Sequence, residues 1–166
     1  LTSRPPQLET HFAVFDENLL TPNDAFFVRY HWSGIPTSID LKSYRLKIHG
    51  KVKTPLELSM EELQKMGEHK ELISINQCSG NGRGHFRPRV NGGQLSNGAM
   101  GNAKWTGIPL KTVLEHAGVQ AGALQVSFNG LDNPPVEGAP DFIKTLNVDH
   151  ALDDEVMLAW SMNGED

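Results

Sequence analysis

Residues 74–110 read SINQCSGNGRGHFRPRVNGGQLSNGAMGNAKWTGIPL and are the most distinctive part of this 166-residue chain. Residues Leu72–Ile75, which overlap the start of this stretch and include two isoleucines, predict a strand that leads directly into Cys78. From Gly80 to Gly107 the chain places 8 of its 16 glycines. We expect one long structured loop here, and such loops are uncommon in compact domains unless they bind something.

The charge of this region differs from that of the rest of the chain. Between Glu71 and Glu115 lie 43 residues without an acid, although the whole chain has 20 acidic and 15 basic residues and a net charge of −5. A basic segment in an acidic protein predicts a local anion site and argues against a nucleic-acid partner. The basic residues of the segment are Arg83, Arg87, Arg89, Lys104 and Lys111.

The composition excludes several classes of protein. Hydrophobic residues make up 38% of the chain and charged residues 21%, which is typical of a globular domain and excludes intrinsic disorder. No apolar run approaches the roughly 18 residues of a membrane span, so we expect no membrane association. The single cysteine, Cys78, excludes a disulfide framework and a zinc site made of thiolates.

The sequence on either side of residues 74–110 mixes short helices with strands. Ser59 and Glu62 form a capping-box pattern that predicts a helix to about Met66. Residues 108–117 have the apolar spacing of a second helix, which Gly118 ends. Because helices and strands do not alternate strictly, we predict an α+β fold with mixed sheets. The other expected segments are an irregular leader over 1–25, extended chain over 26–32, and strands over 44–49, 124–128 and 155–160.

Cys78 and its neighbours allow three chemical interpretations. A thiolate favoured by nearby cations and backbone N–H groups is both a nucleophile and a soft metal ligand. The cysteine phosphatase loop, which places five residues between its cysteine and arginine, fits poorly because four residues separate Cys78 from Arg83. A metal at a single thiolate needs its other ligands from a cofactor. In the third interpretation Cys78 is a small buried hydrophobic residue.

Together with three other segments, residues 74–110 resemble the molybdopterin domain of the sulfite oxidase family. The other segments are FFVRYHW (26–32), FNGLD (128–132) and EVMLAWSMNGED (155–166). The similarity is greatest to the bacterial periplasmic branch, which comprises sulfite dehydrogenases and the sulfane dehydrogenase subunit of the sulfur-oxidising system. The resemblance implies that residues 26–166 are the N-terminal portion of a sulfite-oxidase-like molybdopterin-binding domain. The remainder of that domain and a dimerisation domain are then expected after residue 166.

The resemblance also implies a set of site residues. Cys78 matches the family's molybdenum ligand, and Arg29 and Arg83 match the catalytic arginines that bind the substrate oxyanion. Many family members have an arginine where this chain has Gly82, which implies a wider or less cationic pocket. The residues implied to bind the molybdopterin cofactor are Phe27, Val28, Arg29, Tyr30, His31, Cys78 and Asp132.

The activity that the resemblance implies is a molybdenum-dependent oxidation of sulfite to sulfate in the periplasm, with electrons passed to a c-type cytochrome. One alternative within the family is oxidation of sulfane sulfur carried on a protein. An alternative of another class is a non-catalytic anion-binding or protein-docking module. For the full-length chain the resemblance implies a homodimer, or a heteromer with a cytochrome subunit.

Overall fold

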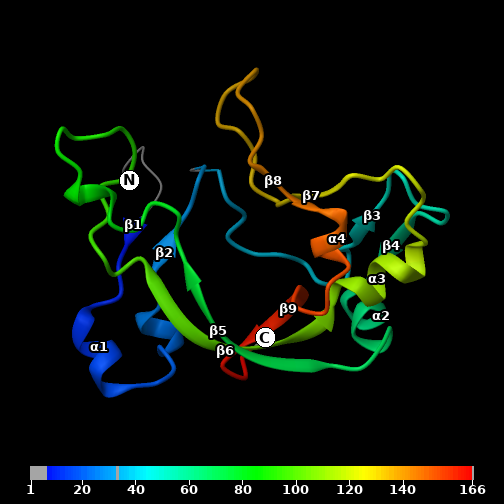
Figure 1. Ribbon diagram of the computed structural model, residues 1–166, viewed down its shortest axis with the longest axis horizontal. Coiled ribbons are helices and arrows are strands. Elements are labelled where there is room, and N and C mark those ends of the chain that lie inside the picture. Colours follow the sequence, from blue (N-terminus) through cyan, green and yellow to red (C-terminus); the bar gives the residue numbers. More distant parts are fainter. Residues whose placement is uncertain (1–6, 33, 166) are drawn as a thin grey trace. The chain divides into compact units, whose positions relative to one another are not determined.

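The computed structural model describes residues 7–32 and 34–165, and its class is α+β, as predicted. Within these residues nine short strands form four small sheets, in the orders β1-β2, β3-β4, β5-β6-β9 and β7-β8 (Figure 1). The chain divides into two compact units. The first unit comprises residues 1–35, 71–105 and 161–166, and the second comprises residues 36–70 and 106–160.

Residues 1–6 of the expected irregular leader (1–25) lie outside the described residues, and residues 7–25 contain short regular elements. These elements are β1 (Gln7–Leu8), α1 (Phe12–Glu17) and the 3-10 turn η1 (Asn23–Ala25). The segment belongs to the same unit as Cys78. β1 pairs antiparallel with β2 (Val28–Arg29), so only part of the expected extended stretch over 26–32 is a strand.

Backbone and threonine hydrogen bonds fix this N-terminal segment within the first unit. Buried Thr10 donates from its amide to Gly98 O at 2.8 Å and from Oγ1 to Met100 O at 3.1 Å. Thr21, also buried, donates its amide to Asn102 O at 2.8 Å and accepts from Asn102 N at 3.1 Å. Since buried backbone groups need partners, these bonds hold the N-terminal segment in a defined place.

The strand β5 (Lys70–Gln77) leads into Cys78 as predicted, but the glycine-rich loop is shorter than expected. β6 (Met100–Pro109) occupies the last part of the range that we expected to be loop. Its glycines mark places of close contact: a Cβ on Gly101 would lie 2.5 Å from the Phe26 ring, and one on Gly107 would lie 2.1 Å from Leu158 O. Glycine is required at these two positions of β6 because another group occupies the space that a side chain would fill.

The substitution Gly107→Ala is therefore expected to lower the free energy of unfolding by about 1–3 kcal/mol, because the blocking atom is backbone and cannot rotate away. Urea denaturation measures this loss. Gly67→Ala is the control: its Cβ would meet the side-chain atoms Thr112 Cγ2 at 3.1 Å and Ile108 Cδ1 at 3.4 Å. Equal losses in the two variants would contradict the explanation.

The second unit contains two antiparallel hairpins and three helices. The hairpins are β3 (Leu46–Ile48) with β4 (Leu56–Leu58), and β7 (Gln125–Asn129) with β8 (Ile143–Asn147). The predicted strands over 44–49 and 124–128 are thus found, whereas β4, β8 and α4 were not predicted. The remaining elements are α2 (Met60–Lys65), α3 (Leu110–Ala117), α4 (Val148–Ala151) and β9 (Met157–Met162).

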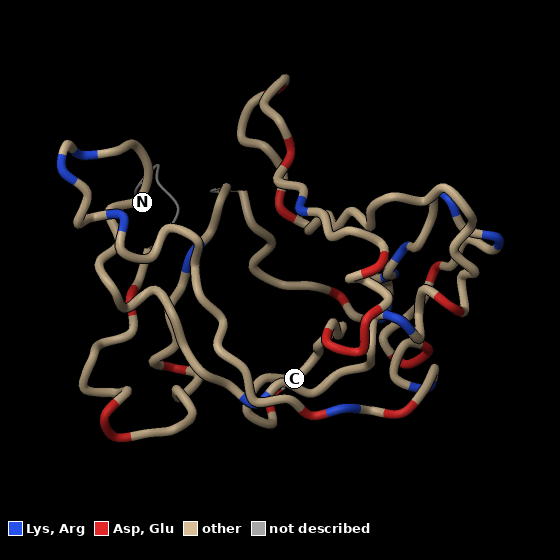
Figure 2. The backbone as a smooth tube through the Cα atoms, viewed as in Figure 1, with Lys and Arg blue, Asp and Glu red and all other residues tan. Residues whose placement is uncertain are grey.

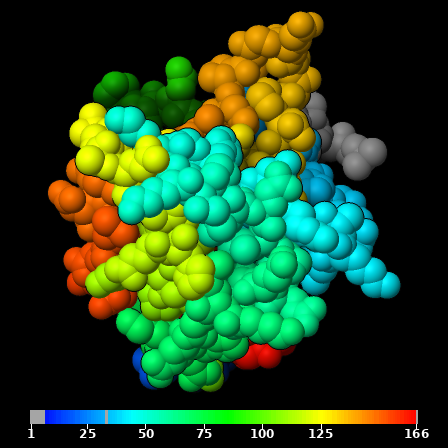
Figure 3. Space-filling view, turned by 90° about the vertical axis from the view of Figure 1, so that its right-hand side faces the viewer, coloured from blue at the N-terminus to red at the C-terminus, as the bar shows by residue number. Residues whose placement is uncertain are grey.

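Helix α3 packs the core of the second unit with the spacing that the sequence predicted. It buries Leu110, Val113, Leu114 and Ala117, at positions i, i+3, i+4 and i+7. Val113 packs with residues of α2 and β4, and the teal and green atoms of this part of the chain lie beside the yellow-green α3 in Figure 3. Gly118 ends the helix with φ of +69°, a conformation that favours glycine. No helix in the described part of the chain is both long and apolar enough to cross a bilayer.

Candidate functional site

The residues after β5 form a folded loop, which we call the cysteine loop and define as residues 78–99. Its two ends are joined by hydrogen bonds. Cys78 N donates to Ala99 O at 2.9 Å, and Ala99 N donates to the Asn81 side chain at 3.1 Å. Further along, Gly84 N donates to Leu95 O at 2.8 Å. Leu95 and Ala99 are almost completely buried, so the loop has a fixed base.

Cys78 itself is half-buried and is a free thiol at the end of β5. The backbone N–H of Gly80 donates to its Sγ at 3.3 Å. An N–H donor directed at sulfur is typical of thiolates that bind metals, because the donor orients the ligand and offsets its charge. Cys78 is not a member of either apolar core cluster of the described residues, so the interpretation as a structural hydrophobic residue is not favoured.

Arg83 lies against the same short piece of backbone. A Cβ on Gly80 would lie 3.2 Å from its guanidinium, and one on Gly92 would lie 2.5 Å from Nη1. The backbone N–H of Arg83 also donates to Gly80 O at 3.0 Å. Because Gly80 and Gly92 have no side chains, the planar guanidinium of Arg83 can lie against both of them. Gly80 is also the residue whose N–H donates to the sulfur of Cys78. The structure therefore brings Cys78 and Arg83 together around Gly80.

Arg29 belongs to the same surroundings through Gln7. Gln7 is the register partner of Arg29 across β1 and β2. The Gln7 side chain lies against Gly93, where a Cβ would be 2.0 Å from its Oε1. Gly93 follows Gly92, on which the guanidinium of Arg83 lies. Gln7 is therefore paired with Arg29 through the backbone, and its side chain lies against the glycine that follows Gly92.

Neither arginine has an acidic partner among the described residues. The four ion pairs there involve lysines only, and Nη1 of Arg29 is buried without a hydrogen-bond partner. Lys104, which also belongs to the first unit, differs because it pairs with Glu71 at 3.0 Å. Figure 2 shows basic positions and no acidic ones along the tip of the cysteine loop. Arg83 beside the thiol and the unpartnered Arg29 in the same unit are donors suited to a small anion.

The other predicted residues are divided between the two units. The Phe27 ring stacks on Phe26 with centroids 5.4 Å apart, and His31 is exposed and packs edge-on against Trp32 at 4.5 Å. Val28 and Tyr30, between them, are half-buried. The first unit thus contains all predicted site residues except Asp132. Asp132 belongs to the second unit, between β7 and β8, where its Oδ1 would lie 2.7 Å from a Cβ on Gly130.

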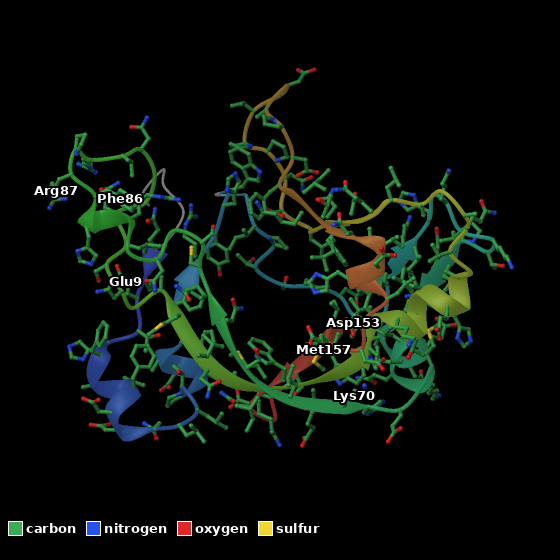
Figure 4. All side chains as sticks on the ribbon, viewed as in Figure 1. Glu9, Lys70, Phe86, Arg87, Asp153 and Met157 are labelled. Carbon is green, nitrogen blue, oxygen red and sulfur yellow. The ribbon has the colours of Figure 1, made fainter. Side chains whose placement is uncertain are left out.

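One residue that fixes the site, Glu9, was not recognised from the sequence. Its carboxylate accepts from Ser96 N at 2.7 Å, from Gly98 N at 3.0 Å and from the hydroxyl of Ser96. Figure 4 shows Glu9 below the loop, apart from Phe86 and Arg87 at its tip. Because Glu9 is 87 residues from Ser96 in the sequence, no local pattern could have indicated this contact. The segment between Glu71 and Glu115 has no acid of its own, and Glu9, the residue directly after β1, provides the carboxylate that binds it.

The hydrogen bonds of Glu9 predict a pH dependence of stability. Burial raises the pKa of Glu9, but the bonds from Ser96 and Gly98, with a smaller effect of His85, together hold it below the ordinary value of 4.5. A lowered pKa in the folded state stabilises the protein above the unfolded pKa, and this stabilisation is lost as the pH falls through the folded value.

We therefore expect Glu9→Gln to lower the free energy of unfolding by about 1–2 kcal/mol at pH 7, because the amide places a donor against two N–H groups. The difference from wild type should vanish on acidification below the folded pKa of Glu9. Urea denaturation between pH 7 and pH 3 measures both effects. Glu61→Gln, which removes only an exposed pair with Lys65, is the control and should cost about 0.3–0.5 kcal/mol. A pH-independent difference would contradict the assignment.

The second unit has a cavity of about 640 Å³ that contains none of the predicted site residues. It lies between α3 and strands β3 and β7, and most of its walls are apolar, including Val113, Leu114 and Val126. In residues 7–32 and 34–165, no three His, Cys, Asp or Glu side chains converge in a metal-binding arrangement.

Comparison with known protein families identifies the domain to which these residues belong. Residues 32–166 match the model of the oxidoreductase molybdopterin-binding domain, which is most of the chain. The chain belongs to this family. The family assignment confirms the predicted resemblance and the predicted cofactor, molybdopterin with molybdenum.

Similar proteins include sulfite oxidases and nitrate reductases. The chain is 36% identical to sulfite oxidase of Gallus gallus over 98% of its own length and 36% of that protein. It is 34% identical to mitochondrial sulfite oxidase of Homo sapiens, over 99% of its own length and 30% of that protein. The chain thus spans about a third of the curated relatives that it matches.

A solved structure agrees with the fold. The crystal structure of the sulfane dehydrogenase SoxCD from Paracoccus pantotrophus matches with a TM-score of 0.72 at 29% identity. The match covers 88% of this chain and 35% of that one. The prediction of a sulfite-oxidase-like molybdopterin-binding fold is therefore confirmed.

The residues of the molybdopterin-binding domain fit its cofactor. The sulfur of Cys78 has a backbone donor and belongs to no group of three metal-ligating side chains among the described residues, which suits a ligand completed by a dithiolene. The unpartnered Nη1 of Arg29 and the glycine positions around Arg83 provide donors for anionic oxygen. The roles of Phe27, Val28, Tyr30, His31 and Asp132 in binding the pterin remain predictions.

Proposed function

We propose that the full-length protein is a molybdenum oxidoreductase that oxidises a reduced sulfur oxyanion, with sulfite as the substrate and sulfate as the product. The observation that carries the proposal is the pair of arginines without acidic partners, Arg29 and Arg83, in the unit that contains Cys78. The sulfite oxidases among the relatives support the choice of substrate.

The residues of this chain would divide the work between binding the cofactor and binding the substrate. Cys78 would hold the molybdenum, and residues 27–31 with Asp132 would hold the pterin. When bound, the molybdenum centre supplies oxygen-atom transfer and accepts two electrons. The Gly80 N–H limits the charge on the sulfur of Cys78.

Arg29 and Arg83 would bind and orient the substrate anion. Guanidinium groups are planar donors that match oxyanion geometry, and their charge is retained at every physiological pH. Because Arg29 Nη1 is shielded from water and has no partner within the described chain, its interaction with an anion is strengthened by the low local dielectric. The oxygen transfer itself needs no acid–base pair, because it moves no proton; the overall oxidation takes its oxygen from water, which loses two protons to the solvent.

Steady-state kinetics of the full-length, molybdenum-loaded protein tests the proposal. The assay follows reduction of a c-type cytochrome or of ferricyanide while sulfite is varied. Saturable, sulfite-dependent reduction with stoichiometric sulfate supports the proposed activity. A fully loaded protein that reduces neither acceptor with any sulfur oxyanion would exclude it, and would favour the non-catalytic anion-binding or docking module.

A second candidate substrate, sulfane sulfur carried on a protein, is favoured by Gly82. This residue has φ of +80°, a conformation that an arginine adopts only with strain. The loop therefore disfavours the additional arginine that many family members have here, and its pocket is less cationic. The similarity to the sulfane dehydrogenase SoxCD supports the same candidate. A higher kcat/KM for a carrier-bound sulfane than for sulfite would select it.

The electron acceptor, location and assembly are part of the same proposal. A c-type cytochrome acceptor and a periplasmic location are supported by the resemblance to the bacterial periplasmic branch. SoxCD, as a structural neighbour, supports a heteromer, and the resemblance also supports a homodimer. Light scattering of the full-length protein, alone and with its cytochrome partner, distinguishes these assemblies. Fractionation of the cells tests the location.

A further inference from the structure

Two buried side-chain nitrogens in the described chain have no hydrogen-bond partner, and they lie three residues apart. They are Nη1 of Arg29 and Nε1 of Trp32. The proposed function accounts for the first, because Arg29 would bind the substrate anion. It does not account for the second, which belongs to a residue just beyond the stretch that the family resemblance assigns to the cofactor.

The indole N–H of Trp32 is a donor that normally has an acceptor when it is shielded from water. Trp105 in the same unit follows that rule, since its Nε1 donates to Ser74 O at 3.1 Å. Trp32 does not follow it, although its ring packs against His31 with centroids 4.5 Å apart. A buried donor without a partner lowers stability, so its presence calls for an acceptor from outside the described residues.

The position of Trp32 indicates which ligand provides that acceptor. Its ring contacts His31, which the resemblance assigns to the cofactor, and it directly follows the segment 27–31. Molybdopterin presents ring nitrogens, a carbonyl and phosphate oxygens, and all of these accept hydrogen bonds. We propose that Trp32 donates its Nε1–H to an acceptor atom of the bound molybdopterin. This proposal rests on the family assignment and on the proposed function, and it makes Trp32 a cofactor-binding residue.

The first test uses the substitution Trp32→Phe in the full-length protein, because phenylalanine keeps an aromatic ring and removes the N–H. The cofactor-free variant should unfold at the same temperature as wild type or at a higher one, since an unsatisfied donor has been removed. The loaded variant should release molybdopterin about tenfold faster, because the bound state has lost a hydrogen bond. Pterin fluorescence after rapid dilution measures the release.

Trp105→Phe is the matched control, and the opposite pattern is expected for it. Removal of the bond to Ser74 O should lower the unfolding temperature of the cofactor-free protein, while the release rate stays within twofold of wild type. A release rate within twofold of wild type in Trp32→Phe would overturn the proposal. So would a cofactor-free Trp32→Phe that is as destabilised as Trp105→Phe.

A second readout uses wild-type protein and does not depend on a variant that folds. In full-length protein with ¹⁵N-labelled tryptophan, the indole signal of Trp32 is identified by its nuclear Overhauser contacts to the His31 ring. Loading with molybdopterin should move this signal and slow its exchange with solvent at least tenfold. An unchanged signal, or one that responds only to sulfite, would overturn the proposal.

These readouts also separate this inference from the proposed function. A protein that retains molybdopterin through Trp32 but does not oxidise sulfur anions would refute the function alone. An active enzyme whose Trp32→Phe variant keeps its cofactor normally would refute the inference alone. A full-length protein that takes up no molybdopterin would refute both.

Discussion

Replacement of Cys78 by serine is expected to reduce turnover of the full-length, loaded protein by more than about 100-fold. The loss of residues that merely orient a metal ligand costs 10–100-fold, so the loss of the ligand itself should cost more. Serine retains a small side chain at the end of β5 but replaces the soft sulfur with a hard hydroxyl. The pterin should remain bound, because residues 27–31 lie in a separate segment of the chain.

The measurement for Cys78→Ser is the steady-state rate per bound molybdenum, which corrects for incomplete loading. Ser79→Ala is the matched control, because Ser79 is the exposed neighbour of Cys78 and no hydrogen bond of its side chain is known from the structure. This control should keep at least half of the wild-type rate. Comparable rates in Cys78→Ser and wild type would remove Cys78 from the metal site.

The second large effect is expected for Arg29→Gln. Loss of one preorganised donor to an oxyanion typically lowers the rate by about 10²–10³-fold, and we expect kcat/KM for sulfite to fall by this factor. The variant should be no less stable than wild type, because it removes a guanidinium nitrogen that is buried without a partner. Kinetics and thermal unfolding on the same preparation measure both quantities.

Arg87→Gln provides the control for Arg29→Gln. Arg87 is exposed near the tip of the cysteine loop, and its Nη1 donates to the carbonyls of Gly84 and Phe86 at 2.9 and 2.8 Å (Figure 4). Both variants lose one positive charge, so a general effect of net charge would reduce both rates equally. The structure predicts instead that Arg87→Gln changes kcat/KM for sulfite by less than threefold. Equal losses of kcat/KM in the two variants would show that the anion does not bind specifically at Arg29.

Local patterns were sufficient to predict the elements that depend on local interactions. The capping box at Ser59 forms as expected, with Glu62 accepting from Ser59 N at 2.8 Å. The apolar spacing of α3 and the terminating Gly118 were also found. These elements were predictable because helix caps and amphipathic spacing involve residues within one or two turns of each other.

The elements that were missed depend on partners far away in the sequence. Gly101 and Gly107 were interpreted as loop residues, but they are glycines because the Phe26 ring and Leu158 O occupy the space beside β6. The strand β1 has only two residues and exists through its pairing with β2. The number of glycines alone cannot distinguish a flexible turn from a strand whose glycines leave room for a neighbouring group.

The same limit applied to the site. The run from Cys78 to Arg83 is contiguous, so its chemistry could be inferred directly from the sequence. Glu9 could not be recognised, because its partners Ser96 and Gly98 follow it by 87 residues or more. The unpaired indole N–H of Trp32 is likewise visible only once the surrounding chain is folded.

X-ray absorption at the molybdenum edge tests the central claim most directly. The measurement compares full-length wild-type protein with Cys78→Ser, both loaded with the cofactor. If Cys78 binds the metal, the number of sulfur neighbours of molybdenum falls by one in the variant, and an oxygen or nitrogen neighbour replaces it. An identical sulfur shell in the two proteins would contradict the assignment of Cys78 and the site built around it.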